Sequence, residues 1–251
     1  MKTIAHILIV IGLLGCGQGE SKLNDQTHSQ DSALHKTEIV RHSTDDLVPT
    51  LNLPEGFRLD TIQTNDTARN LSIFISIPVS GIKLLDKVVF DEIEKQKDDF
   101  TRSLDEMIKE DKGILSSINS GFQAEPVSVY KDSKVTSILY IISYYHGGAA
   151  HPMTMYYSFN FDSKTQKRIS FSDYFIVKNS ADTAFMTDLI TEAVGREGVF
   201  VSGLKDIDFN IEQDTISFNF DDYEIASYAE GIMQGRIQRQ MLKDKVKITY
   251  R

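Results

Sequence analysis

Two runs of alternating residues, separated by a short glycine-rich segment, constrain the fold of this chain more than any other feature. Within each run, large apolar or aromatic residues alternate with small or polar ones, which is the period-two pattern of a β-strand with one buried face. The residues predicted to share one face are Tyr140, Ile142 and Tyr144 before the break and Met153, Met155, Tyr157, Phe159 and Phe161 after it. Gly147 and Gly148 permit the positive φ angles of a tight turn, which the flanking tyrosines and methionines would adopt only with strain. The sequence therefore predicts a β-hairpin with residues 146–152 as its loop.

The other periodic segments predict two helices and further strands. Apolar residues recur every three or four positions over residues 82–112, with charged residues between them, which indicates an amphipathic helix ending at Gly113. A second helix is predicted to begin at a Ser180 cap and to end at Gly195. Strands are predicted at residues 71–78, 122–130, 134–145, 207–211, 215–220 and 246–250. Because consecutive strands are joined by short turns, we predict an α+β fold, with two main helices packed on a mostly antiparallel sheet.

The start of the chain carries the pattern of a lipoprotein signal. Lys2 is followed by an apolar run at residues 7–14, too short to span a bilayer, and the run closes with LLGC at residues 13–16. Cys16 is the only cysteine in the chain, and its position suits cleavage before it and attachment of lipid, diacylglycerol and palmitate, to it. We expect residues 1–15 to be a signal peptide and the mature protein to be anchored in the cell envelope, in the periplasm or at the outer surface. An ordinary secretory signal with an incidental cysteine is the alternative.

The composition of the remaining chain separates a tether from a folded domain. Residues 16–46 are polar and of mixed charge, so they cannot bury enough apolar surface to offset the entropy lost on ordering. We predict a disordered tether there and one folded domain over residues 47–251. The net charge of −9 argues against nucleic acid as a partner, because its phosphates would be repelled. The charge suits a cationic partner, although acidity can also serve solubility alone.

Two stretches of the chain resemble one family of extracytoplasmic domains. The first is the predicted hairpin, whose loop reads HGGAAH at residues 146–151 and whose second strand continues into FNFDSKTQKRISFSDYF at residues 159–175. The second reads ISFNFDDYEIASYAEGIMQG at residues 216–235. Both resemble the domain found in RsiV-type anti-sigma factors and in the non-catalytic half of PdaC-type peptidoglycan deacetylases. In that family the hairpin carries Gly-Gly-Ala-His, so one alanine is added here, and Asp222 replaces the usual proline.

The resemblance implies a binding domain of the cell envelope. RsiV-type domains bind lysozyme outside the cell, so the implied partner is a cationic envelope protein such as lysozyme, or peptidoglycan. The resemblance extends from about Leu71 to Arg251 and includes neither a sigma-binding segment nor a deacetylase domain, so neither activity is carried over. We expect a lipid-anchored binding module, with the membrane contacted through the lipid alone. A peptidoglycan- or polysaccharide-modifying hydrolase is the alternative.

The candidate binding residues come from these two stretches. Tyrosine is favoured at interfaces because it offers apolar area together with a polar tip. The candidates are Tyr144, Tyr145, His146, Gly147, Gly148, His151, Tyr223 and Tyr228. The alternative for the tyrosines is that most of them fill the core between helix and sheet.

No catalytic or metal motif stands out in the sequence. His146 and His151 lie five residues apart, but zinc requires three or four ligands and their loop contains no carboxylate or thiol. The Asp221-Asp222 pair resembles the acidic core of polysaccharide deacetylases, but no histidine follows His151 to complete such a metal site. The Gly-x-Ser-x-Gly elbow of serine hydrolases is absent. We therefore expect a protein that is not an enzyme and that needs no metal or cofactor.

Overall fold

A computed structural model of the chain describes residues 39–41, 51–111, 117–196 and 203–251. By its internal contacts the chain divides into two units, Met1–His35 and Lys36–Arg251. The first unit, and with it the expected signal peptide and Cys16, lies outside the described residues, as does Gly113. The fold and all sites below belong to the second unit.

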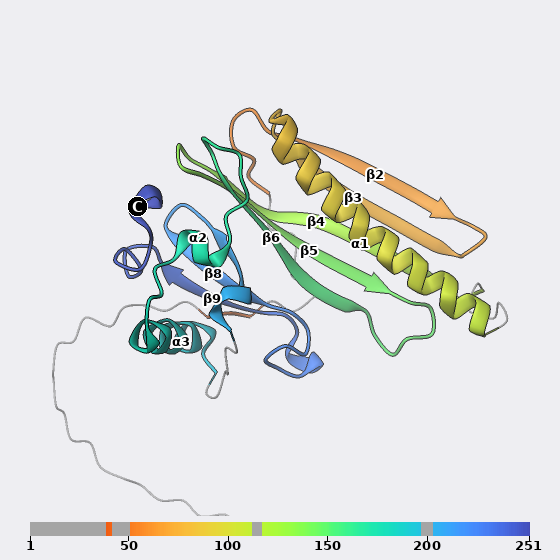
Figure 1. Cartoon of the computed structure of the whole chain (residues 1–251). Coiled ribbons are helices and arrows are strands. Elements are labelled where there is room, and N and C mark those ends of the chain that lie inside the picture. Colours follow the sequence, from red (N-terminus) through yellow and green to blue (C-terminus); the bar gives the residue numbers. More distant parts are fainter. Residues whose placement is uncertain (1–38, 42–50, 112–116, 197–202) are drawn as a thin grey trace, which may run out of the picture. The chain divides into compact units, whose positions relative to one another are not determined.

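The second unit contains two β-sheets with helices packed against them (Figure 1). Its elements are β1 (Ile39–Arg41), β2 (Arg58–Asp66), β3 (Leu71–Val79), α1 (Lys83–Glu110), β4 (Ser120–Lys131), β5 (Val135–Tyr145), β6 (Met153–Asp162), α2 (Phe171–Tyr174), α3 (Ser180–Val194), η2 (Leu204–Asp206), β7 (Asp208–Ile211), β8 (Thr215–Phe220), η3 (Tyr228–Glu230), β9 (Met233–Gln238) and η4 (Ile248–Tyr250). The first sheet has the strand order β2-β3-β4-β5-β6, and the second has the order β1-β9-β8-β7. The α+β prediction is therefore confirmed, with the strands divided between two sheets.

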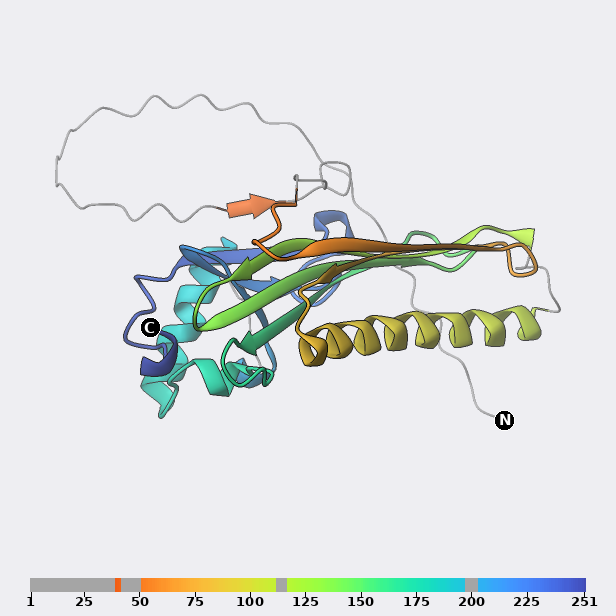
Figure 2. The ribbon, with the colours of Figure 1, turned by 90° about the horizontal axis from the view of Figure 1, so that it is seen from above.

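The five-stranded sheet is built around the predicted hairpin. Strands β5 and β6 pair antiparallel with Tyr140 opposite Tyr157, so the alternating residues on the two strands share one face. Helix α1 lies along that face (Figure 2) and connects β3 to β4, the one parallel pair among the strands of this sheet. A parallel pair needs such a long crossover because its second strand must start at the same end as its first. The helix residues buried against the sheet are Leu85, Val89, Ile93, Phe100 and Leu104.

The four-stranded sheet has its own core, formed with α2 and α3. Helix α3 lies against β9 at Gly235, where a Cβ atom would come within 2.9 Å of the Val194 side chain. The close approach explains why a glycine occupies this position in a buried strand. Gly195 ends α3 in the left-handed conformation with a φ of 70°, as the sequence predicts. Strand β1, which lies within the stretch expected as tether, pairs with β9 at the edge of this sheet.

Buried polar side chains join the two sheets. The Ser137 hydroxyl donates a hydrogen bond to the Asn160 side chain at 2.7 Å and accepts one from the Ile211 N–H at 2.9 Å. The Asn160 amide in turn donates to the Phe209 carbonyl at 2.7 Å. These bonds connect β5 and β6 of one sheet to β7 of the other. Because each buried group is paired, the contact fixes how β7 lies against the first sheet.

Three predictions about these elements are wrong. Helix α1 ends at Glu110, with Asp111 as its C-cap, and not at Gly113. Asn179 caps α3 in place of Ser180, since its side-chain oxygen accepts the Asp182 N–H at 2.9 Å. Residues 246–250 do not form a strand: Val246 makes an isolated bridge to Phe175, and the helix η4 follows. The alternating pattern of Val246 and its neighbours is satisfied by packing Val246 into the core of the four-stranded sheet.

Candidate functional site

The glycine-rich hairpin loop is pressed against the segment that leads into β4. The Gly147 N–H donates to the Ser120 hydroxyl at 2.9 Å, and a Cβ atom on Gly147 would lie 2.8 Å from the Ile118 carbonyl oxygen. Gly148 has a φ of 87°, a conformation that favours glycine. Both glycines are therefore required by the backbone, and they hold the loop in a fixed position beside the first sheet.

His146 and Tyr144 belong to the core and not to an exposed surface. The His146 ring lies 4.6 Å from the Phe100 ring and 5.8 Å from the Tyr144 ring, between α1 and the sheet. Burial lowers the pKa of His146, and its buried Nε2 has no hydrogen-bond partner among the described residues. For Tyr144 the alternative given for the tyrosines, packing against the core, therefore describes the structure, and the partly buried His146 packs beside it.

Tyr145 points to the opposite face of the sheet from Tyr144. Its hydroxyl donates to the Ala149 carbonyl at 3.0 Å, which closes the hairpin loop. The residue also lines a pocket of about 290 Å³ with Phe74 and Gln123. Tyr145 is thus separate from the aromatic residues described next.

Three rings from the two resembling stretches meet at the protein surface. We call His151, Tyr223 and Tyr228 the aromatic patch. The His151 ring stacks on the Tyr228 ring with centroids 3.6 Å apart and planes 19° from parallel. The Tyr223 hydroxyl lies 2.9 Å from His151 Nε2, and the Pro152 carbonyl lies 3.0 Å from Nδ1, so with the proton on Nδ1 the hydroxyl donates to Nε2. Tyr223 is 54% exposed and has a φ of 67°, which is uncommon for a residue other than glycine.

Two carboxylates fix the second segment against β6. The Thr154 N–H donates to Asp222 at 2.8 Å, and the Tyr156 N–H donates to Asp221 at 2.8 Å. The Asp222 N–H donates back to the Thr154 carbonyl at 3.3 Å. The N–H and the carboxylate of Asp222 thus both form hydrogen bonds with β6. A proline at this position has neither group. The paired aspartates are therefore positioning residues for Tyr223, a role that their resemblance to a deacetylase motif does not indicate.

Burial perturbs three carboxylates near the junction of the sheets. It raises the pKa of Asp208 to about 7 and that of Asp221 to about 6, and it raises the pKa of Asp222 as well. Such shifts occur in catalytic acids, but also in structural carboxylates. Asp208 accepts the Ser158 hydroxyl at 2.9 Å across the two sheets, and the two other aspartates hold β6. These contacts account for all three carboxylates as structural groups.

The segment that carries Tyr223 and Tyr228 is rich in acidic residues, most of which already have partners. Residues 221–230 contain four acidic residues and no basic one. Glu230 forms a salt bridge with Arg196, and its carboxylate also closes a capping box with Ser227.

Across the described part of the chain, no group of three or more histidine, cysteine, aspartate or glutamate residues could hold a metal ion. None of the described helices is long and apolar enough to cross a membrane.

The fold occurs in solved proteins of a family without an assigned function. A member of the DUF3298 family from Bacteroides fragilis aligns with a TM-score of 0.52 at 20% identity, covering 77% of this chain and 94% of its own. A DUF3298 family protein from Pseudomonas aeruginosa PAO1 aligns with a TM-score of 0.54 at 14% identity, covering 77% of this chain and 96% of its own. No family model and no curated protein matches the sequence. The chain thus shares the fold of DUF3298 proteins.

Proposed function

We propose that this protein is a lipid-anchored binding module of the cell envelope that holds a cationic partner protein against the aromatic patch. The observation that carries the proposal is the convergence of His151, Tyr223 and Tyr228 from segments about 70 residues apart in the chain. Two aspartates position the second segment, and Tyr223 remains more than half exposed. A packed group of aromatic rings, with one ring exposed and two partly buried, is a typical centre of a binding interface.

The net charge of the chain supports a cationic partner. The segment beside the patch has four acidic residues, but Asp221 and Asp222 bind β6 and Glu230 pairs with Arg196, so the support comes from the net charge of −9. Opposite charges accelerate encounter and select the orientation of the partner, while the desolvated rings supply affinity. Lysozyme is the first partner to test, since it is cationic and is the partner that the family resemblance implies.

Isothermal titration calorimetry of the purified full-length protein with a c-type lysozyme tests the proposal. We expect saturable binding that persists at about 0.15 M salt, where charges are screened beyond roughly 8 Å. Cytochrome c, another small cationic protein, serves as the control and should not bind at this salt concentration. Equal binding of both proteins, or loss of lysozyme binding at this salt, would indicate nonspecific charge attraction. Binding of chitooligosaccharide in place of lysozyme would favour a glycan module.

The lipid anchor is a separate part of the proposal. Cys16 lies directly after an apolar run that ends in Leu-Leu-Gly, which is the observation that motivates it. Replacing Cys16 with serine removes the thiol that would carry the lipid. Cys16→Ser should therefore move the protein from the membrane fraction to the soluble fraction, as measured by fractionation and immunoblotting. A variant that stays as membrane-bound as the parent would contradict the anchor and leave the binding proposal intact.

A further inference from the structure

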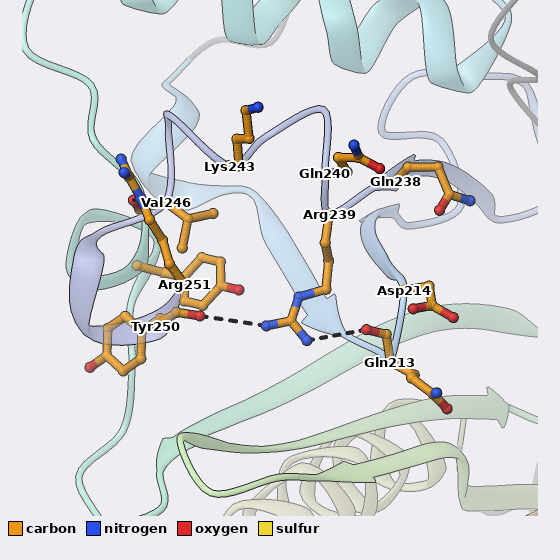
Figure 3. A pocket seen from close by; sticks show the side chains of 10 residues that line it. Gln213, Asp214, Gln238, Arg239, Gln240, Lys243, Val246, Tyr250 and Arg251 are labelled. Carbon is orange, nitrogen blue, oxygen red and sulfur yellow. Dashed lines mark hydrogen bonds between the residues drawn. The ribbon is translucent and has the colours of Figure 1, made fainter.

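A polar pocket lies in the second sheet's half of the fold, away from the residues of the aromatic patch. It is bounded by the turn between β7 and β8, by the chain after β9 and by η4 (Figure 3). Its volume is about 520 Å³, within the range of small-molecule sites in proteins.

Arg239 places a guanidinium group in this pocket with only loose partners. One terminal nitrogen lies 3.3 Å from the carbonyl oxygens of Glu212 and Gln213 and 3.4 Å from the Tyr130 hydroxyl, and the other lies 3.5 Å from the Tyr250 carbonyl oxygen. Figure 3 draws the contacts with Gln213 and Tyr250. Its nearest carboxylate, that of Asp132, is 3.9 Å away. Strong charge-assisted hydrogen bonds measure about 2.7–2.9 Å, so these contacts leave the cation with capacity for an anion.

Tyr174 lines the same pocket, and its hydroxyl lies beside Arg239 without a hydrogen bond of normal geometry. The residue is fully buried, and its ring stacks on Tyr250 with centroids 5.3 Å apart. Its hydroxyl has no hydrogen-bond partner among the described residues. Burial raises the pKa of Tyr174 to about 12, against the opposing effect of the neighbouring Arg239, so the hydroxyl keeps its proton. A buried hydroxyl without a partner is costly, and one on a residue that lines a pocket can be satisfied by an acceptor that arrives with a ligand.

The rim adds polar groups suited to a small polar ligand. Gln238 at the end of β9 and Gln240 just after it contribute amides, and Lys243 contributes a second cation, all three exposed. This concentration of donors contrasts with the acidic character of the chain as a whole. Amides at the rim, a tyrosine stack and a buried donor beside a cation are the elements of a site for a polar, singly charged anion.

We propose that this pocket binds a small carboxylate-bearing ligand, whose carboxylate accepts from the Tyr174 hydroxyl and pairs with Arg239. A planar carboxylate matches the guanidinium fork with two parallel hydrogen bonds. A phosphate dianion fits less well, because Asp132 and Asp214 both lie at this site and repel a second negative charge. The carboxylate can come from an acidic N-acetylated sugar or from the C-terminus of a short peptide. The site is independent of the aromatic patch and of the partner proposed for it.

Matched pairs of ligands test this proposal and separate the two sources. N-acetylmuramic acid and N-acetylglucosamine differ by a carboxylate-bearing group, and N-acetylalanine differs from its amide by the carboxylate itself. Each is titrated into the ¹⁵N-labelled full-length protein while the Nε–Hε signals of arginine are followed by NMR. We expect at least one carboxylate to saturate with a Kd on the order of 1 mM or below, and its neutral counterpart to bind about tenfold more weakly or not at all.

Variants connect the binding to the two proposed donors. Tyr174→Phe should weaken the carboxylate about tenfold, the usual effect of losing one hydrogen bond to a charged group. Arg239→Gln should abolish binding, and Arg102→Gln, which removes an exposed arginine of α1, should leave it unchanged. Because the Tyr174 hydroxyl has no partner in the free protein, Tyr174→Phe should also leave the melting temperature unchanged or raise it.

Four binding results and one stability result would overturn the proposal. The binding results are equal titration by the carboxylate and neutral members of both pairs, no saturation by any of them up to about 10 mM, full binding by Tyr174→Phe, and tighter binding of inorganic phosphate than of either carboxylate. A lower melting temperature of Tyr174→Phe without ligand would show that the hydroxyl already has a partner, and would remove the observation on which the site rests.

Discussion

Replacing Asp208 with asparagine should stabilise the protein at pH 8 and reduce the dependence of its stability on pH between about 4 and 7. Burial raises the pKa of Asp208 from 3.8 to about 7, and the nearby Asp221 carboxylate raises it further. The hydrogen bond from the Ser158 hydroxyl and the charge of Arg168 oppose this shift. Asparagine keeps an oxygen that can accept the Ser158 hydroxyl and introduces no charge into the junction of the sheets.

The sign of the effect follows from proton linkage. Between about pH 4 and pH 7 the folded protein holds the Asp208 proton more tightly than the unfolded chain does. The free energy of unfolding therefore falls as pH rises through this window, and above it the folded state contains an unfavourable buried charge. Asp208→Asn removes the cost of this buried charge. The free energy of unfolding of the variant should therefore exceed that of the parent by on the order of 2 kcal/mol at pH 8, and the difference should vanish near pH 4.

Urea unfolding at pH 4, 6 and 8 measures this prediction. Asp188→Asn, which neutralises an exposed carboxylate of α3, is the matched control and should follow the parent at each pH. If Asp208→Asn is no more stable than the parent at pH 8, Asp208 is well solvated or carries an essential charge. In that case our assignment of this carboxylate to a structural role would be wrong.

The sequence predicts those elements whose apolar residues repeat with one clear period. The hairpin of β5 and β6 and the helix α1 each place their alternating or fourth-position residues on one buried face, so both are anticipated from pattern alone. Strand β2 is not anticipated, because it lies at an edge of its sheet and eight of its nine residues are exposed. Without a buried face there is no alternation to detect, and its pairing with β3 is decided by tertiary contacts.

Strand β9 is not predicted from the sequence, for a different reason. It is largely buried, but its residues read MQGRIQ, in which two glutamines, an arginine and a glycine interrupt any apolar pattern. Gly235 is required by the approach of α3, and the Gln234 amide donates to the buried Asn219 side chain at 2.8 Å. Gly235 and Gln234 are both explained by contacts with residues that are distant in the chain. Local sequence propensity therefore does not predict the strand.

Among the candidate binding residues, the structure separates those that meet at the surface from those that pack beneath α1. All were proposed because they lie in the two stretches that carry the family resemblance. His151, Tyr223 and Tyr228 lie together at the surface, while Tyr144 and His146 pack beneath α1. Residues of opposite parity on a strand face opposite ways, so period-two alternation already separates Tyr144 from Tyr145. It does not indicate that the loop of one hairpin meets a segment some 70 residues later.

Tyr228→Ala should weaken the binding of lysozyme at least tenfold. The Tyr228 ring stacks on His151 and stands 5.9 Å from the Tyr223 ring, so its removal takes away one ring and the stacking partner of His151, while the contact between Tyr223 and His151 remains. A central aromatic residue of an interface typically contributes about 2 kcal/mol or more, which corresponds to about 30-fold in Kd. Neither Asp221 nor Asp222 is altered, so the segment should keep its hydrogen bonds to β6.

Phe90→Ala is the matched control for this variant. Phe90 is an exposed aromatic residue on α1 and takes no part in the patch, so its replacement should leave the affinity for lysozyme unchanged. Circular dichroism and thermal unfolding of both variants establish that each is folded before binding is measured. Any loss of affinity specific to Tyr228→Ala then reports on the patch.

The most direct measurement of our central claim is therefore the Kd of lysozyme for the parent, Tyr228→Ala and Phe90→Ala proteins, determined by calorimetry at about 0.15 M salt. We predict that the parent and Phe90→Ala bind equally and that Tyr228→Ala binds at least tenfold more weakly. Equal affinity of all three proteins for lysozyme would contradict the claim that the aromatic patch is the binding site.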